Sequence, residues 1–152
     1  MKAKHIFLFL TLMLTAFYFV GCKKRTRTPE ATTLGTITVD LNANNRVVRK
    51  KEALIGNLIC DAIYKSLLSK GKTIDGAFVN GGNIRFNSEI RPNGIYPAGQ
   101  FTDQMVTEMM PFGNEIMIVK VNGRQLKEIF ERSLANYPVA KGPFLQISKG
   151  IF

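Results

Sequence analysis

Asn80-Gly81-Gly82-Asn83-Ile84-Arg85 follows directly after the short apolar run Ala77-Phe78-Val79. An apolar run that ends at paired glycines predicts a strand followed by a tight loop. Glycine lets the backbone approach a ligand closely, and arginine offers a planar set of donors that suits phosphate or carboxylate. The stretch therefore predicts an anion-binding corner, with an ordinary Asn-Gly turn as the alternative.

A second motif, Pro111-Phe112-Gly113-Asn114, comes at the end of a predicted helical turn. It places an aromatic ring beside a Gly-Asn turn, and an exposed ring of this kind can stack on a base. The alternative is that Phe112 fills the core beside Met109 and Met110. The motif predicts a base-stacking platform if the ring is exposed.

Five segments of the chain occur in a fixed order: Val48-Arg49, Glu52 to Ala62, the NGGNIR and PFGN motifs above, and Gly142 to Gln146. From about residue 34 to residue 148 the sequence resembles the C-terminal domain of the 5′-nucleotidase family, in which these segments have the same order. The helix start at Asn122 also fits. The resemblance implies an α+β fold, with a mixed sheet and helices. It also implies that this domain binds the nucleoside while an N-terminal dimetal phosphoesterase domain hydrolyses the phosphate.

The resemblance further implies a substrate-binding site made of Arg49, Asn80, Gly81, Gly82, Arg85 and Phe112. Asn80 corresponds to an asparagine that hydrogen-bonds the nucleoside, and Phe112 to one of two rings that sandwich the base. Arg49 and Arg85 correspond to arginines that can hold phosphate or ribose hydroxyls through charge-assisted hydrogen bonds. For Arg85, a surface ion pair with Glu89 is the alternative.

Several features depart from the family pattern. Asn83 replaces a third glycine, and the stretch between Arg85 and Phe112 is longer than usual. The sequence ends at Phe152 without the Gly-Gly-Asp-Gly-Phe motif that carries the second stacking ring, and it contains no metallophosphoesterase domain. We therefore expect a truncated domain with weak binding, no catalytic residues and no cofactor, since the two divalent metals of the family belong to the missing domain.

The N-terminus has the pattern of a lipoprotein signal peptide over residues 1–21. Lys2 and Lys4 precede an apolar run from Ile6 to Val20, and Gly21-Cys22 follows. We expect cleavage and lipid attachment at Cys22, which would place the protein at a bacterial cell envelope, on its periplasmic or outer-membrane face. An uncleaved membrane anchor is the alternative, but the run is shorter than the ~20 residues that a spanning helix needs.

The net charge of +10 does not indicate nucleic-acid binding, because six of the 21 basic residues precede Pro29, where there are no acidic residues. Residues 22–33 form a basic tether, and the chain after Pro29 has 15 basic and 11 acidic residues. Within the predicted domain, residues 34–152, one dense cluster contains Arg46, Arg49, Lys50 and Lys51. This cluster is either a solvated loop or the positive rim of an anion site.

The two cysteines and the single histidine offer no catalytic group. Cys22 is the predicted lipidation site, so Cys60 has no disulfide partner and is expected to be a small core residue. His5 lies in the signal peptide. The predicted domain has no clustered carboxylates or histidines, so we expect no metal ligands in it.

Hydrophobic periodicity and turn residues predict the remaining elements. Strands are expected at residues 34–41, 75–79, 115–121 and 144–148, with turns at 42–45 and 91–94. Helices are expected at residues 52–69, 102–110 and 124–135. The last helix should bury Leu126, Ile129, Phe130 and Leu134, and Thr102 should cap the helix that follows it.

These features together predict an envelope lipoprotein that recognises a nucleotide or nucleoside weakly, without independent catalysis. Two alternatives stay open. The chain could be half of a split 5′-nucleotidase that acts with a separate metallophosphoesterase domain, or a structural or adhesive lipoprotein that reuses the fold. The expected partners are thus a nucleotide, a catalytic domain and the membrane, but no nucleic acid.

Overall fold

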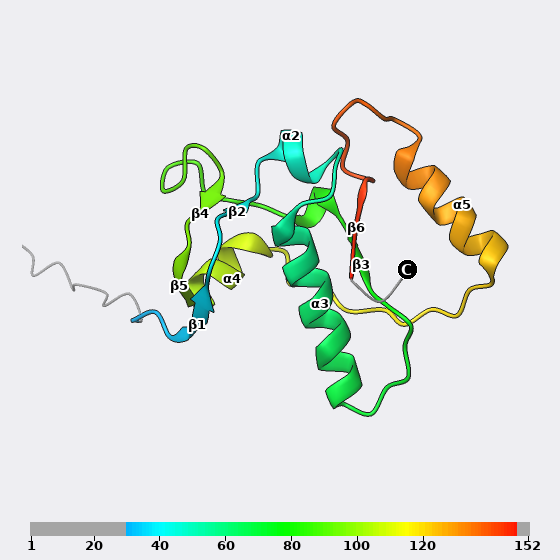
Figure 1. Cartoon of the computed structure of the whole chain (residues 1–152), viewed down its shortest axis with the longest axis horizontal. Coiled ribbons are helices and arrows are strands. Elements are labelled where there is room, and N and C mark those ends of the chain that lie inside the picture. The colour runs from blue at the N-terminus through cyan, green and yellow to red at the C-terminus, as the bar shows by residue number, and fades with distance from the viewer. Residues whose placement is uncertain (1–29, 149–152) are drawn as a thin grey trace, which may run out of the picture. The chain divides into compact units, whose positions relative to one another are not determined.

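Helices and short strands are mixed along the part of the chain that our computed structural model describes, residues 30–148 (Figure 1). The strands are β1 Thr33–Ile37, β2 Leu41–Asn42, β3 Phe78–Asn80, β4 Ile95–Tyr96, β5 Gly99–Thr102 and β6 Leu145–Ile147. The helices are α2 Asn45–Val48, α3 Leu54–Ser69, α4 Asp103–Met109 and α5 Gly123–Leu134, with a 3₁₀ turn, η2, at Gly81–Asn83. The predicted signal peptide, most of the tether and Cys22 lie outside the described residues.

The strands form three antiparallel pairs, β1 with β5, β2 with β4, and β3 with β6. The strand predicted at residues 34–41 is therefore two strands, separated by a bend at residues 38–39. The Asp40 carboxylate accepts a hydrogen bond from Ala98 N at 2.8 Å, between β4 and β5. This contact joins the two bends, so the chain turns from one strand pair to the other.

Helix α3 confirms the helix predicted at residues 52–69 and forms one wall of the core. It buries Ile55, Gly56 and Cys60 against β2, β3 and β6, and it ends before Gly71, which has a φ of +71°. Leu54, the first residue of the helix, is 55% exposed. The rest of the core comes from the strands and from the ends of α2 and α4.

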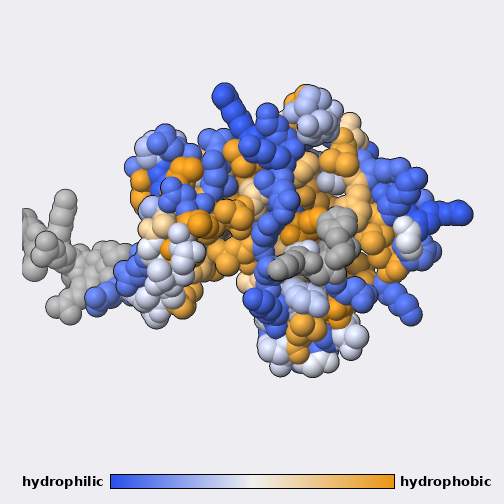
Figure 2. Space-filling view, in the orientation of Figure 1, coloured by the Kyte–Doolittle hydropathy of each residue, from blue (hydrophilic) through white to orange (hydrophobic). Residues whose placement is uncertain are grey.

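Two helix starts follow the side chains that predict them. The Thr102 hydroxyl accepts a hydrogen bond from Met105 N at 3.3 Å and caps α4, as expected. Asn122 and Gln125 form a reciprocal capping box at the start of α5, with distances of 2.9 and 3.0 Å. Figure 2 shows apolar surface between β6 and α5, while the outer side of α5 is hydrophilic. Leu134, predicted to face inward, is 52% exposed.

The strand predicted at residues 115–121 does not form. This segment is the yellow coil between α4 and α5 in Figure 1, and every one of its residues is exposed. A β-strand needs a hydrogen-bonding neighbour, and the segment pairs with no described strand. Among residues 30–148, no helix combines the length and the hydrophobicity needed to cross a membrane.

Candidate functional site

The Asn-Gly-Gly-Asn corner sits where β3 ends beside the loop that leads into β6. Gly81 N donates to Phe144 O at 2.7 Å, and Gly82 N donates to Gly142 O at 2.9 Å. The Asn80 amide nitrogen also donates to Gly142 O, at 3.3 Å. These bonds continue the β3–β6 pairing past the last strand residue and hold the corner in a fixed conformation.

Gly81 and Gly82 are required by packing against protein backbone. A Cβ atom on Gly81 would lie 1.9 Å from Val48 O, at the end of α2. A Cβ atom on Gly82 would lie 3.0 Å from Gly142 Cα. Neither glycine has a positive φ. The two glycines thus let the corner approach α2 and the loop before β6 closely. The contact with α2 brings Arg49 next to the corner.

Arg85 connects the corner to the Pro-Phe-Gly motif. Its backbone nitrogen donates to Met109 O at 3.0 Å, which fixes the residue against the end of α4. Its guanidinium lies over the Phe112 ring, 4.8 Å from the ring centre, and donates to Gly82 O and to Ile84 O. Arginine over an aromatic face is a favourable cation–π arrangement.

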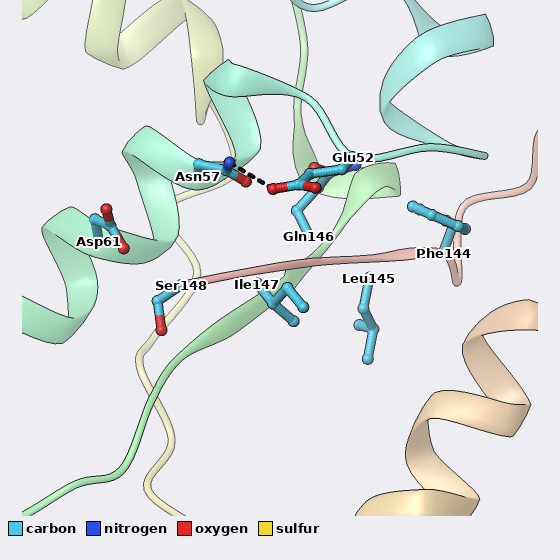
Figure 3. Close-up of a pocket in the computed structure, with 8 residues that line it drawn as sticks. All are labelled: Glu52, Asn57, Asp61, Phe144, Leu145, Gln146, Ile147 and Ser148. Atoms are coloured by element: carbon cyan, nitrogen blue, oxygen red, sulfur yellow. Dashed lines mark hydrogen bonds between the residues drawn. The ribbon is translucent and has the colours of Figure 1, made fainter. Parts of the chain in front are cut away.

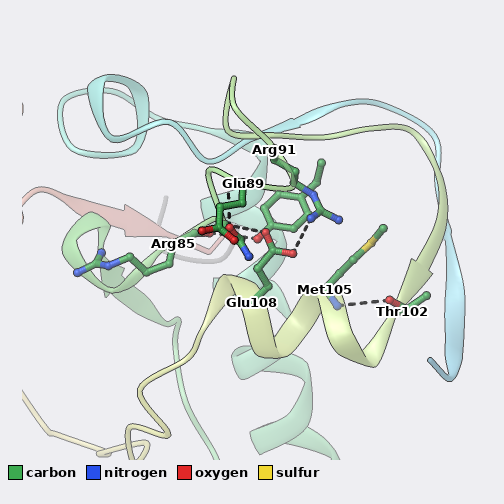
Figure 4. A network of polar contacts seen from close by, with 8 residues as sticks. Arg85, Glu89, Arg91, Thr102, Met105 and Glu108 are labelled. Carbon is green, nitrogen blue, oxygen red and sulfur yellow. Dashed lines mark hydrogen bonds and ion pairs between the residues drawn. The ribbon is translucent and has the colours of Figure 1, made fainter. Parts of the chain in front are cut away.

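The alternatives given above, core packing for Phe112 and a surface ion pair for Arg85, are both wrong. Phe112 is 53% exposed and does not join Met109 in the core. Arg85 makes no ion pair with Glu89, and Figure 4 shows its guanidinium directed away from that carboxylate. The ring is exposed because the chain leaves α4 at Met110 and turns outward through Gly113, which has a φ of +60°.

Arg49 places a second positive charge near Arg85. It terminates α2, and its Nε is buried without a hydrogen-bond partner among the described residues. Burial lowers the pKa of the Arg85 guanidinium, and the charge of Arg49 lowers this pKa further. Neither arginine has a carboxylate partner in the described part of the chain. Two unneutralised guanidinium groups in one place attract an anion.

A partly buried ion pair supports the Arg85 backbone from the other side (Figure 4). Arg91 and Glu108 lie 2.6 Å apart, and Glu108 also accepts from Asn87 N at 2.7 Å. The Arg91 guanidinium covers the Tyr96 ring at 4.3 Å, and the Tyr96 hydroxyl donates to Arg85 O at 3.2 Å. Burial, and then the Glu108 carboxylate, raise the pKa of Tyr96, so the hydroxyl stays protonated and remains a donor.

Gln146 organises the corner, although its residue type and position alone predicted no such role. This side chain is 1% exposed and uses three hydrogen bonds. Its oxygen accepts from Ala53 N at 2.9 Å, and its nitrogen donates to Val48 O at 2.9 Å and to Lys51 O at 2.8 Å. It therefore fixes the loop that carries Arg49. A polar residue inside an apolar strand pattern was the only signal that could have identified it.

A cavity of about 480 Å³ lies between α3 and β6 (Figure 3). Its lining includes Glu52, Asn57 and Asp61 from the α3 side and Phe144 from the β6 side. It contains none of the six predicted site residues. Within residues 30–148, no group of three or more histidine, cysteine or carboxylate side chains is placed to hold a metal ion.

Thus four of the predicted side chains, Arg49, Asn80, Arg85 and Phe112, surround one corner that the two glycines make possible. They come from α2, the end of β3, the segment after η2 and the segment after α4. Arg46, Lys50 and Lys51, which flank Arg49 in sequence, are exposed. The arrangement combines positive charge with an exposed aromatic face, and this combination suits an aromatic anion.

Known proteins are similar to this chain in both sequence and fold. The profile described as 5′-nucleotidase, C-terminal domain, matches residues 33–152. The 5′-nucleotidase of Rattus norvegicus is 34% identical over 119 residues, which are 75% of this chain and 20% of the relative. The snake venom 5′-nucleotidase of Macrovipera lebetinus is 33% identical over 120 residues, which are 76% of this chain and 28% of the relative.

A solved structure gives the same result. The crystal structure of a 5′-nucleotidase precursor from Thermus thermophilus aligns with a TM-score of 0.65 at 27% identity. The alignment covers 96% of this chain and 24% of that one, so the chain spans only a fraction of the length of the proteins it resembles. The likeness confirms the predicted α+β fold of this type. The chain belongs to the 5′-nucleotidase C-terminal domain family.

Proposed function

We propose that this chain binds a nucleotide at the corner formed by Arg49, Asn80, Arg85 and Phe112. One observation carries the proposal. The Arg85 guanidinium lies on an exposed aromatic ring, beside a second arginine whose buried Nε has no partner among the described residues. The relatives named above are 5′-nucleotidases, and their names support the same ligand class for this chain.

The ring and the arginines would bind different parts of the ligand. Arg85 covers one face of Phe112, so a base would stack on the other face, a contact worth ~1–3 kcal/mol in nucleic-acid systems. The phosphate would lie near the two guanidinium groups, where charge-assisted hydrogen bonds are strong. With one stacking face available, we expect a dissociation constant of about 1 mM, equivalent to ~4 kcal/mol.

Binding can be tested by an NMR titration with AMP and with adenosine. Phe112→Ala should weaken both ligands by about one decade, since it removes stacking. Arg85→Ala should weaken AMP more than adenosine and should reduce the salt dependence of AMP binding. Arg124→Ala, which removes an exposed arginine of α5, is the matched control and should change neither affinity. Chemical-shift changes that leave all four corner residues unmoved would contradict the proposal.

We further propose that this chain does not hydrolyse the ligand by itself. Hydrolysis of a phosphate ester needs an activated water and stabilisation of the developing charge. In this family the resemblance assigns that chemistry to a metallophosphoesterase domain with two divalent metals. The purified chain should release no phosphate from AMP with added divalent metals. Turnover that follows the protein through purification, and is lost in Arg85→Ala, would contradict this.

A split 5′-nucleotidase is the second candidate. Its support is the family membership of this chain, since the relatives named above are 5′-nucleotidases. In that case the domain would hold substrate for a metallophosphoesterase domain supplied separately. Adding a purified metallophosphoesterase domain of this family to the chain should then produce AMP hydrolysis that neither protein shows alone.

We propose that the protein is attached to a bacterial cell envelope through lipid on Cys22. The support is the sequence pattern of residues 1–22, which lie outside the described part of the structure. Two acyl chains would give stable attachment, whereas one chain gives only marginal binding. Labelling with a radioactive fatty acid tests this. The label should appear on the wild-type chain and disappear in Cys22→Ser, and equal labelling of both would contradict it.

A further inference from the structure

Glu108 uses both of its carboxylate oxygens to hold the segment that follows Arg85. Its Oε1 accepts from Asn87 N at 2.7 Å, and its Oε2 accepts from Arg91 Nη1 at 2.6 Å. The Glu108 side chain is only 16% exposed, so solvent and salt screen these contacts less than they would screen exposed ones. Figure 4 shows Glu108 directed from α4 toward Arg91. One side chain therefore fixes residues 87–91 against α4.

The two sides of this contact lead to Arg85 and to Phe112. Asn87 comes two residues after Arg85, and Glu108 comes four residues before Phe112. Next to Glu108, Met109 O accepts a hydrogen bond from Arg85 N at 3.0 Å. The contact between Asn87 and Glu108 thus holds the segment of the arginine beside the segment of the ring.

Tyr96 holds the Arg85 backbone from its other side. Its hydroxyl donates to Arg85 O at 3.2 Å, and the Arg91 guanidinium covers its ring at 4.3 Å. Both backbone groups of Arg85 are therefore bonded, the nitrogen to α4 and the oxygen to Tyr96. With the backbone fixed in this way, the arginine side chain starts from one defined position.

The contact between Arg85 and Phe112 needs this support. Phe112 is 53% exposed, so the contact lies at the surface. A cation–π contact at an exposed site is weaker than the conformational entropy that an ordered arginine side chain loses. The bonds from the guanidinium to Gly82 O and Ile84 O lie within its own segment and do not reach the ring. The contact therefore depends on the bonds that join the two segments.

We propose that Glu108 and Tyr96 are positioning residues of the corner, which hold Arg85 at the Phe112 ring. The consequence for binding rests on the proposed function, in which the arginine binds the phosphate and the ring stacks on the base. Without Glu108 both groups remain, but their separation is no longer fixed. A ligand that must contact both groups then binds more weakly.

The ring current of Phe112 reports the contact without any ligand. In the full-length chain, solubilised in detergent and isotope-labelled on arginine, the Arg85 side-chain protons should be shifted upfield, because the guanidinium lies over the ring. Arg85→Lys assigns the signal, and Phe112→Ala gives its value without the ring. An amide at position 108 can accept from only one of the two donors at each moment. The Arg85 signal of Glu108→Gln should therefore move most of the way to the Phe112→Ala value.

Glu89→Gln is the matched control. Glu89 lies in the same segment, is exposed and makes no ion pair among residues 30–148. Its substitution should leave the Arg85 signal at the wild-type value. An unchanged signal in Glu108→Gln, or equal changes in the two variants, would overturn the proposal. If Glu108→Gln does not fold, Tyr96→Phe decides, because it removes only the bond to Arg85 O. A wild-type signal in that variant would overturn the proposal, and movement toward the Phe112→Ala value would support it.

Ligand binding provides the second test. Glu108→Gln should weaken AMP by about threefold, in the lower range for coupled residues, and should change adenosine less, since adenosine needs only the ring. Equal weakening of AMP and adenosine would indicate a general loosening of the corner and would overturn the proposal. If the wild type does not bind AMP at the corner, the proposed function fails, and the ring-current measurement still decides whether Glu108 positions Arg85.

Discussion

Two apolar runs of this chain both predict strands, and only one of them becomes a strand. The run at residues 77–80 pairs with β6, and Val79 in it is 8% exposed. The run at residues 115–121 pairs with no described strand, and Val119 in it is 54% exposed. Both runs consist mainly of apolar residues, and the second is richer in β-branched residues. Strand propensity is therefore insufficient without a partner that supplies hydrogen bonds and burial.

The paired run differs because three other parts of the chain fix it. Gln146 of β6 lies opposite Val79 and ties the α2–α3 loop to the same layer. Gly81, directly after β3, packs against the end of α2. Cys60 of α3 donates from Sγ to Gln146 O at 3.2 Å. The residues of the paired run and its contacts can be substituted one at a time. A residue of the same type in or near the unpaired run, or elsewhere on the surface, serves as the control.

The largest change in stability is expected at Gly81, the glycine that follows the paired run. Gly81→Ala places a Cβ atom 1.9 Å from a backbone oxygen, so α2 and β3 must separate. We expect a loss of about 4 kcal/mol in the free energy of unfolding. Gly123→Ala, after the unpaired run, has no atom within 4 Å of the new Cβ and lies in a helix, so it should be neutral or slightly stabilising. Denaturant unfolding measures both, and equal stabilities would contradict the account of the corner.

The next effect concerns the partner strand. Gln146→Ala leaves Ala53 N and Val48 O buried without their partner and removes the bond to Lys51 O, which should cost about 3 kcal/mol. Gln100→Ala, in β5, removes an exposed side chain and should cost less than about 0.5 kcal/mol. Because Gln146 fixes the Arg49 loop, the NMR signals of Arg49 should shift in the first variant only. An unchanged Arg49 environment would show that the loop does not depend on Gln146.

A matched valine pair then compares the two runs directly. Val79→Ala removes two buried methyl groups and leaves a cavity, with an expected loss of about 2 kcal/mol. Val119→Ala truncates an exposed side chain and should change stability by less than about 0.5 kcal/mol. Thermal unfolding at low protein concentration measures both under conditions that disfavour association. A large loss in Val119→Ala would show that the second run is packed in solution.

The last effect is absent at neutral pH and appears only as the pH rises. Burial raises the pKa of Cys60 from 9.0 to about 12. Above about pH 9 the unfolded chain ionises this thiol and the folded chain does not, so stability should fall by about 1.4 kcal/mol per pH unit. Cys60→Ser lacks this titration, so the difference between wild type and variant should shrink from pH 9 to pH 11. A difference that stays constant over this range would contradict the burial of a neutral thiol.

The sequence predicted the helices better than the strands. The pattern that gives α3 is local, and the caps Thr102 and Asn122 act on residues three positions away. The strand predicted at residues 34–41 merged β1 and β2 into one element. The bend between them is held by the hydrogen bond from Ala98 N to Asp40, and Ala98 lies far along the chain. Local signals therefore located the helix ends, and long-range contacts decided the strands.

The candidate site divides in the same way. The residue types of the two motifs, and their family resemblance, predicted which side chains to examine. The sequence did not show that Arg85 lies on Phe112, because they are separated by a segment whose path depends on the Arg91–Glu108 ion pair and on Tyr96. It also did not show the role of Gln146, since its three partners lie far from it in sequence.

The sequence by itself determined the mixture of helices and strands and the positions of α3, α4 and α5, while α2 was not predicted. The three helix positions depend on periodicity and capping, which act over a few residues. Only the tertiary structure decided that residues 77–80 pair while residues 115–121 do not. The physical reason is that a strand completes its hydrogen bonds with another segment, so its formation depends on which segment lies beside it.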